Sequence, residues 1–241
     1  MVNNVLLNNV SHQNLKVAAR YGAEFGDSLG SVLAFPTEFV ELQKEYPILF
    51  RKDSETDRYK ATVLLGLSQD ENLFLNPGAR SGWAANYVPA VVAKGPFLIG
   101  LQDSNNNHAP LIYIDLDHAK VGREDGVALF LEHGGSSPYL KRIVSVLEMI
   151  HNGMGVQDVM FDAFAELDLI EPLSIEIDLH NGQKHKLVGN YTINHKKLAE
   201  LSGDKLERLS RLGFLPLAYA VVASLTNIQT LIEIKKAKNA M

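Results

Sequence analysis

Cysteine is absent from the 241-residue chain. Its absence excludes disulfide bonds, thiolate metal sites and a cysteine nucleophile. Long apolar runs are also missing, because the most apolar segment, residues 214–225, is shorter than the roughly 20 residues that span a bilayer. We therefore expect no transmembrane segment, and a buried helix at residues 214–225.

The chain also lacks the short motifs that bind phosphates or activate a serine. It contains no GxxxxGKS or GxxxxGKT loop, no GxGxxG loop between a strand and a helix, and no GxSxG turn. We therefore expect no cofactor, and we assign no catalytic residue.

Basic residues are fewer than acidic residues, 23 against 28, and the formal net charge is −5. The lysines and arginines are scattered except for Lys235, Lys236 and Lys238 near the C-terminus. Because nucleic acids bind through neutralised phosphates, this balance predicts no nucleic-acid partner. Residues 1–20 lack the basic and long apolar regions of a secretory signal, so we expect the protein in the cytoplasm.

The pattern of turn-forming residues changes along the chain. Glycine, proline, asparagine and aspartate divide residues 1–135 into short segments. A short helix is predicted at residues 39–46, before Pro47. The clearest hairpin joins residues 96–102 to residues 110–116 through a polar loop.

The later part of the chain reads mainly as helix. Ser136 or Ser137 can cap a helix that continues to Ile150, and Gly153 and Gly155 then separate it from a second helix. Further helices are predicted at 195–201, capped by Asn194, and at 204–212 and 215–237. Between these helices, alternating residues at 174–179 and 184–193 flank Asn181-Gly182, which is typical of a hairpin turn.

These elements predict an α+β fold, in which helices pack on an antiparallel, hairpin-rich sheet and the C-terminal part is mainly helical. We expect a single domain over residues 1–241. The alternative is two closely packed subdomains, a β-rich one at 1–135 and a helical one with one hairpin at 136–241.

The stretch at residues 82–97, GWAANYVPAVVAKGPF, holds the only tryptophan. A tryptophan in a loop before a short aromatic helix can line a ligand groove or pack in the core. Trp83, Tyr87, Pro89 and Phe97 are therefore candidate ligand-binding residues, with core packing as the alternative.

Asp115, Asp117 and His118 form the strongest candidate metal site. The two aspartates share one face at the end of a predicted strand, and hard cations prefer carboxylate oxygens. The longer series of ligands that an EF-hand needs is missing.

Four segments carry a family resemblance: EYPILF at 45–50; VLLGL at 63–67 with ENLFL at 71–75; the stretch at 82–97; and residues 189–231, which include Tyr191-Thr192-Ile193. In this order and spacing, from about residue 15 to 231, the chain resembles the SapC family of bacterial proteins. The resemblance implies a link to surface-layer biogenesis or export, and it supplies no catalytic residues.

Together these features predict a non-enzymatic protein that binds a polypeptide or a small ligand and is linked to surface-layer or envelope export. An export protein would be its partner, and peripheral envelope association and a homo-oligomer are further alternatives. The rival hypothesis is a metal-dependent enzyme, or an enzyme accessory, that uses Asp115, Asp117 or His118.

Overall fold

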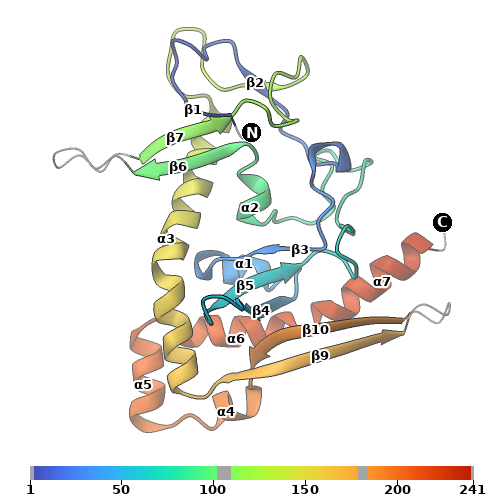
Figure 1. The fold of residues 1–241 in the computed structure, drawn as a ribbon, viewed down its shortest axis with the longest axis vertical. Coiled ribbons are helices and arrows are strands. Elements are labelled where there is room, and N and C mark those ends of the chain that lie inside the picture. The colour runs from blue at the N-terminus through green and yellow to red at the C-terminus, as the bar shows by residue number, and fades with distance from the viewer. Residues whose placement is uncertain (1–2, 102–109, 179–183, 240–241) are drawn as a thin grey trace. The chain divides into compact units, whose positions relative to one another are not determined.

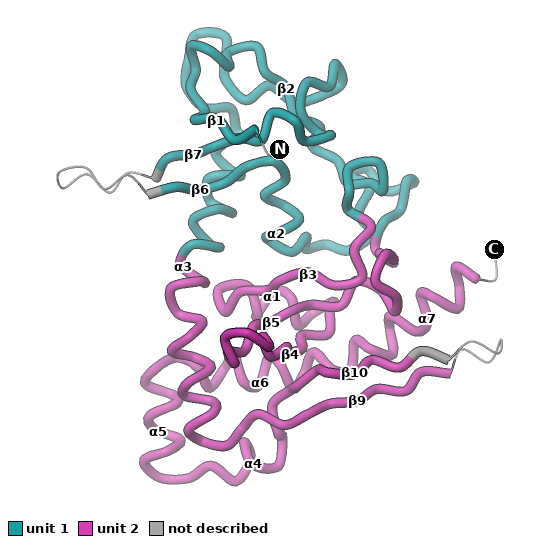
Figure 2. The backbone as a smooth tube through the Cα atoms, viewed as in Figure 1, with its two compact units in different colours: residues 1–27, 75–151 teal, residues 28–74, 152–241 magenta. Residues whose placement is uncertain are grey.

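A computed structural model describes residues 3–101, 110–178 and 184–239. The chain divides into two compact units (Figure 2). Unit 1 comprises residues 1–27 and 75–151, and unit 2 comprises residues 28–74 and 152–241. This division does not coincide with the boundary after residue 135 considered from the sequence, because each unit takes two separate segments of the chain.

Unit 1 contains a three-stranded antiparallel sheet in the order β1-β7-β6 and a two-stranded ladder of β2 and β8. Its elements are β1 (Asn4–Leu6), β2 (Lys16–Val17), the 3₁₀ helix η1 (Ala23–Phe25), α2 (Ala90–Ala93), β6 (Phe97–Leu101), β7 (Pro110–Asp115) and β8 (Val127–Ala128). The predicted hairpin at 96–116 is confirmed, with Phe97 opposite Ile114, and its loop at 103–108 lies outside the described residues.

The core of unit 1 forms where this sheet meets the first turns of a long helix. Phe97 and Ile114 are fully buried and pack with Leu140, Ile143 and Leu147 from that helix. The helical residues recur at spacings of three and four, so they present one apolar face to the sheet.

Unit 2 is built on a five-stranded antiparallel sheet in the order β3-β5-β4-β10-β9 (Figure 1). Its strands are β3 (Ser31–Leu33), β4 (Ile48–Lys52), β5 (Tyr59–Leu64), β9 (Ile170–Asp178) and β10 (Lys184–Ile193). Its helical elements are η2 (Pro36–Glu38), α1 (Phe39–Leu42), α4 (His195–Ala199), α5 (Gly203–Arg211), α6 (Leu215–Ser224) and α7 (Asn227–Asn239). The β9–β10 hairpin is confirmed, although its Asn181-Gly182 turn lies outside the described residues. These sheets and helices confirm the α+β class.

One helix, α3 (Pro138–Glu166), contributes to both units and corrects the sequence prediction of two helices. It begins after Ser137, whose hydroxyl accepts a hydrogen bond from the Leu140 amide at 3.2 Å. The helix continues through Gly153 and Gly155, because each glycine costs a helix only about 1 kcal/mol relative to alanine. Gly153 is also required by packing, since a Cβ there would lie 2.5 Å from the Cβ of Phe35.

The C-terminal segment forms two helices instead of the single helix predicted at 215–237, because Leu225 and Thr226 separate α6 from α7. The Ser224 hydroxyl, fully buried, accepts a hydrogen bond from the Ile48 amide at 2.9 Å and so ties α6 to β4. Residues 215–239 are long and apolar enough to cross a membrane by length and composition only, and 28% of their most apolar window is buried. Core helices meet the same criterion, so this segment carries no assignment.

Candidate functional site

A cavity of about 260 Å³ lies within unit 1, and we call it the Tyr21 pocket. Four parts of the chain line it: the segment after β2, the 81–95 stretch, the turn at residue 120 and the first turns of α3. The lining residues are Ala18, Ala19, Arg20, Tyr21, Ser81, Ala85, Asn86, Val88, Ala93, Gly95, Lys120, Tyr139, Arg142 and Ile143.

Close backbone packing joins Tyr21 to the beginning of the 82–97 stretch. The Tyr21 amide donates a hydrogen bond to the Ser81 carbonyl at 2.8 Å. Gly82 has a φ of 78°, and a Cβ at this position would lie 2.1 Å from the Tyr21 carbonyl oxygen. Only glycine fits this conformation and this approach, so the sequence dictates the contact locally.

The four predicted ligand-binding residues lie around the pocket and are not among its lining residues. Trp83 is 3% exposed and makes an edge-to-face contact with the Tyr21 ring, with 5.5 Å between the ring centres. Phe97 is fully buried and contacts the Tyr139 ring in the same manner at 6.3 Å. The aromatic residues of the stretch therefore support two tyrosines that do line the pocket.

The other two predicted residues have structural contacts in the same unit. The half-buried Tyr87 directs its hydroxyl at the sulfur of Met149, 3.6 Å away. Pro89 is buried and precedes α2, where its carbonyl accepts hydrogen bonds from the amides of Val92 and Ala93 at 2.9 Å. The stretch reaches the pocket instead through its smaller neighbours Ala85 and Val88.

Lys120 is the most deeply buried charge of the pocket, with 2% of the residue exposed. Its ammonium group lies 3.0 Å from a carboxylate oxygen of Asp27 and 4.6 Å from the centre of the Tyr21 ring. Burial lowers the pKa of Lys120, while the Asp27 carboxylate opposes this shift. Lys120 is therefore a compensated cation that fixes the position of the Tyr21 ring.

Two arginines complete the charge of the pocket. Arg20 is exposed and lies 3.8 Å from Glu24 and 3.7 Å from Asp125. Arg142 is exposed on α3, and no carboxylate among the described residues lies within ion-pair distance of its guanidinium group. The three cations face a pocket whose lining includes no aspartate or glutamate.

The two tyrosines that line the cavity carry neutral hydroxyl groups. Burial raises the pKa of Tyr21, and the charge of Arg142 partly opposes this shift. Burial likewise raises the pKa of Tyr139. Both phenols therefore stay protonated at neutral pH, where they can donate hydrogen bonds to an incoming ligand.

The predicted metal residues lie close together in the sequence at the end of β7, with Asp115 as its last residue and Asp117 and His118 in the turn that follows. An oxygen of Asp115 accepts hydrogen bonds from the amides of Asn3 at 3.2 Å and Asp117 at 3.1 Å. The Nδ1 atom of His118 accepts a hydrogen bond from the Lys120 amide at 3.1 Å. Burial, followed by the charge of Lys120, lowers the pKa of His118. Across the described ranges, no group of three His, Asp and Glu side chains is placed to share a metal ion.

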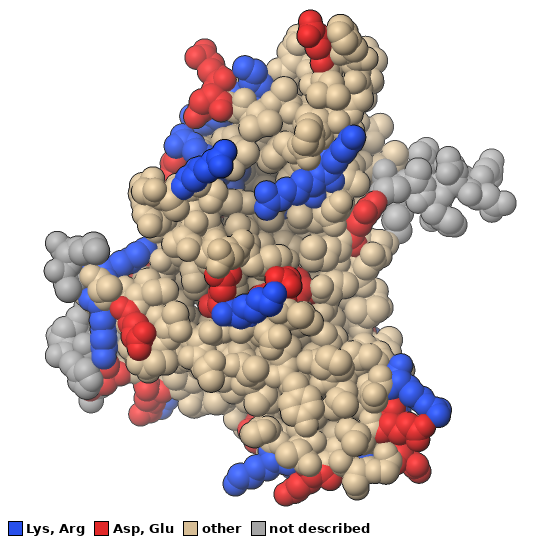
Figure 3. All heavy atoms as spheres, turned by 180° about the vertical axis from the view of Figure 1, so that it is seen from behind, with Lys and Arg blue, Asp and Glu red and all other residues tan. Residues whose placement is uncertain are grey.

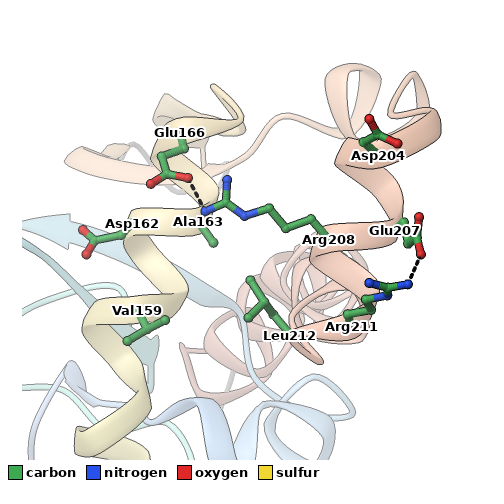
Figure 4. A pocket seen from close by; sticks show the side chains of 9 residues that line it. All are labelled: Val159, Asp162, Ala163, Glu166, Asp204, Glu207, Arg208, Arg211 and Leu212. Carbon is green, nitrogen blue, oxygen red and sulfur yellow. Dashed lines mark ion pairs between the residues drawn. The ribbon is translucent and has the colours of Figure 1, made fainter.

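A second cavity, of about 700 Å³, lies within unit 2 between α3 and α5 (Figure 4). We call it the α3–α5 groove. Figure 4 shows Arg208 reaching from α5 to Glu166 on α3, while Arg211 pairs with Glu207 on its own helix. Because all four side chains are more than half exposed, water screens these pairs strongly.

Surface charge is dispersed over the face shown in Figure 3. Among the residues coloured there, Lys and Arg side chains and Asp and Glu side chains occur in small groups separated by uncharged surface. This distribution matches the scattered charges of the sequence.

Three residues that shape the pocket, Tyr21, Lys120 and Arg142, were not identified from the sequence. No motif surrounds any of them. Tyr21 and Lys120 lie about a hundred residues apart in the sequence, and Lys120 and Arg142 about twenty. The signal that the sequence does contain is the 82–97 stretch, which packs against Tyr21 and Tyr139 on two other walls of the pocket.

Comparison with curated proteins and with solved structures gives no significant match. Comparison with protein families gives the SapC family, whose model matches residues 7–231. The match includes the 82–97 stretch and every residue that lines the Tyr21 pocket and the α3–α5 groove. Since it covers nearly the whole chain, the protein belongs to the SapC family.

Proposed function

We propose that this protein is a non-enzymatic binding protein whose ligand, a small molecule or a segment of a polypeptide, occupies the Tyr21 pocket. One observation carries the proposal. The pocket combines three cations and two neutral phenols with an apolar wall, and no acidic group lines it. Such a mixture of apolar surface and a few directed polar groups is typical of ligand sites.

The polar groups of the pocket favour binding over catalysis. The two phenols have pKa values raised by burial, so they keep their protons near neutral pH, and Lys120, whose pKa burial lowers, is engaged by the Asp27 carboxylate. The volume of about 260 Å³ is slightly below the roughly 300–1,000 Å³ of drug-sized sites, which favours a small ligand or one end of a larger one.

The proposed cellular role follows from the family. We place the protein in the cytoplasm, where it would bind a component of surface-layer or envelope export. Deletion of its gene is then expected to reduce the amount of surface-layer or envelope protein on the cell. Unchanged surface protein would contradict the export role and leave the binding proposal to its own test.

Binding in the pocket can be tested by saturation-transfer NMR with a library of small molecules. Ala85 lines the pocket, so Ala85→Leu is expected to fill part of the cavity and remove the signals of bound molecules. Ala84→Leu is the matched control, because Ala84 is exposed and does not line the pocket. Equal binding to both variants, or no binding to the wild type, would contradict the proposal.

A further inference from the structure

The three cations of the Tyr21 pocket differ in their ion-pair partners. Lys120 has Asp27 as its partner at 3.0 Å, and Arg20 lies within 3.8 Å of two carboxylates outside the pocket. Arg142 has no such partner among the residues that the structure describes. Its guanidinium group is therefore the pocket cation that is available to pair with an anionic ligand.

Arg142 and Tyr139 lie on the same face of α3 and line the same pocket. They lie three residues apart on α3, and Ile143 follows at the next position, so all three share one helical face. All three line the pocket. Tyr21 lines it from the segment after β2, and the charge of Arg142 reaches the phenol groups of both tyrosines.

This set of groups fits a carboxylate better than a phosphate. A guanidinium group binds either anion through two parallel hydrogen bonds. The single guanidinium group without a carboxylate partner matches the charge of a monoanion, whereas a dianion would place a second negative charge in the pocket without an unpaired cation to meet it. Ile143, Val88 and Ala85 supply apolar surface for the carbon skeleton beside the anionic group.

Resting on the proposed function, we infer that the Tyr21 pocket recognises a carboxylate, which Arg142 holds and to which Tyr21 and Tyr139 donate hydrogen bonds. Two sources share this chemistry. One is a small organic acid, and the other is the C-terminal carboxylate of a polypeptide.

The test is isothermal titration of the full chain with benzoate, with neutral benzamide and inorganic phosphate as comparison ligands. We expect benzoate to bind more tightly than either. Arg142→Gln is expected to weaken benzoate binding roughly ten- to hundredfold, the range for a lost hydrogen bond to a charged group. Arg142→Lys keeps the positive charge but removes the two parallel donors of the guanidinium group, and it is expected to give an intermediate loss of benzoate affinity.

Lys141→Gln is the matched control, because Lys141 is the exposed neighbour of Arg142 and does not line the pocket. It removes the same charge from the same helix and is expected to change benzoate affinity less than twofold. Since residues 141 and 142 are both exposed, circular dichroism should show the same helix content for both variants.

A peptide pair distinguishes the two sources of the carboxylate. A short peptide with a free C-terminus that binds better than benzoate, and loses this advantage when amidated or when Arg142 is replaced, supports a polypeptide end. Tighter binding of benzoate than of either peptide supports a small organic acid.

Equal binding of benzoate and benzamide, both abolished by Ala85→Leu, would overturn the carboxylate assignment while leaving the pocket as a binding site. Tighter binding of phosphate than of benzoate would overturn it as well. Binding that is unaffected by Ala85→Leu would contradict the proposed function itself.

Discussion

The Tyr21 pocket of unit 1 and the α3–α5 groove of unit 2 use charge in opposite ways. The groove holds four acidic residues and two arginines, and each arginine is paired with a glutamate of the same groove. The pocket holds three cations and no acid, and Arg142 is left unpaired among the described residues. Among the described residues, the pocket therefore leaves a positive group, Arg142, without an ion-pair partner, whereas the groove leaves two negative groups, Asp162 and Asp204, without one.

Burial separates the ion pairs of the two sites further. The side chains of Lys120 and Asp27 are 3% and 11% exposed, whereas those of Arg208 and Glu166 are 55% and 53% exposed. Removing one partner of a buried pair strongly lowers the free energy of unfolding, because the remaining charge stays out of water. Removing one partner of an exposed pair changes the free energy of unfolding little, because water solvates the remaining charge.

The largest expected effect comes from Asp27→Asn. This substitution leaves the Lys120 ammonium buried without its carboxylate, and it is expected to lower the free energy of unfolding by about 3–5 kcal/mol. Urea denaturation at pH 7 measures the loss.

Glu166→Gln is the matched substitution in the groove, because it also removes one carboxylate from an ion pair with a basic side chain. Its expected cost is about 0–1 kcal/mol. Similar losses for the two variants would contradict the distinction between a buried pair in unit 1 and a screened pair in unit 2.

The next effect tests whether unit 2 depends on close packing near the groove. Gly153→Ala would place a Cβ 2.5 Å from the Phe35 side chain and 2.7 Å from the Thr37 hydroxyl oxygen. Overpacking is expected to cost about 1–3 kcal/mol, more than the roughly 1 kcal/mol that alanine gains over glycine in a helix.

Gly155→Ala provides the control within the same helix. A Cβ at residue 155 would meet no atom within 4 Å apart from its chain neighbours and the backbone of its own helix, so alanine is expected to stabilise the protein by about 0.5–1 kcal/mol. Thermal unfolding of the two variants should shift in opposite directions, and shifts of the same sign would show that the Phe35 contact is not tight.

The smallest effect concerns Lys94, a half-buried lysine of unit 1 for which the structure gives no acidic partner among the described residues. Burial lowers the pKa of Lys94 from its ordinary value of 10.5. The unfolded chain therefore binds this proton more tightly than the folded protein does. As the pH rises from the pKa of Lys94 in the folded protein to 10.5, the free energy of unfolding should therefore increase. The increase is about 1.4 kcal/mol for each pH unit by which folding lowers this pKa.

Lys94→Met removes this titration. Urea denaturation of both proteins at pH 7.5 and pH 10 is expected to show the wild type gaining stability relative to the variant as the pH rises. The comparison cancels the titration of the tyrosines, which both proteins share. A stability difference that is independent of pH would mean that the Lys94 ammonium is solvated in the folded state.

Local patterns predicted much of the fold because local interactions produce it. The alternating residues at 174–178 lie in β9, and Asn194 caps α4 by accepting a hydrogen bond from the Lys197 amide at 2.9 Å. The need for glycine at residue 153 of α3 could not be predicted, since it comes from close packing against Phe35, which lies far away in the sequence.

The candidate site shows the same limit. The 82–97 stretch is recognisable from its composition, and it does form one wall of the Tyr21 pocket. Its large aromatic residues attract attention in the sequence, yet Trp83 and Phe97 pack behind Tyr21 and Tyr139. Which side chain faces a cavity depends on tertiary packing between segments, and spacing along one segment cannot supply that information.

The missing side chain at Gly82 has a consequence for how the family can diverge. Any larger residue would displace the Tyr21 carbonyl, 2.1 Å from the position of its Cβ, and with it the phenol that lines the pocket. Natural variants of the pocket can therefore exchange lining residues to suit new ligands while residue 82 stays unchanged. A position that lines no part of this cavity would then be among the slowest to evolve.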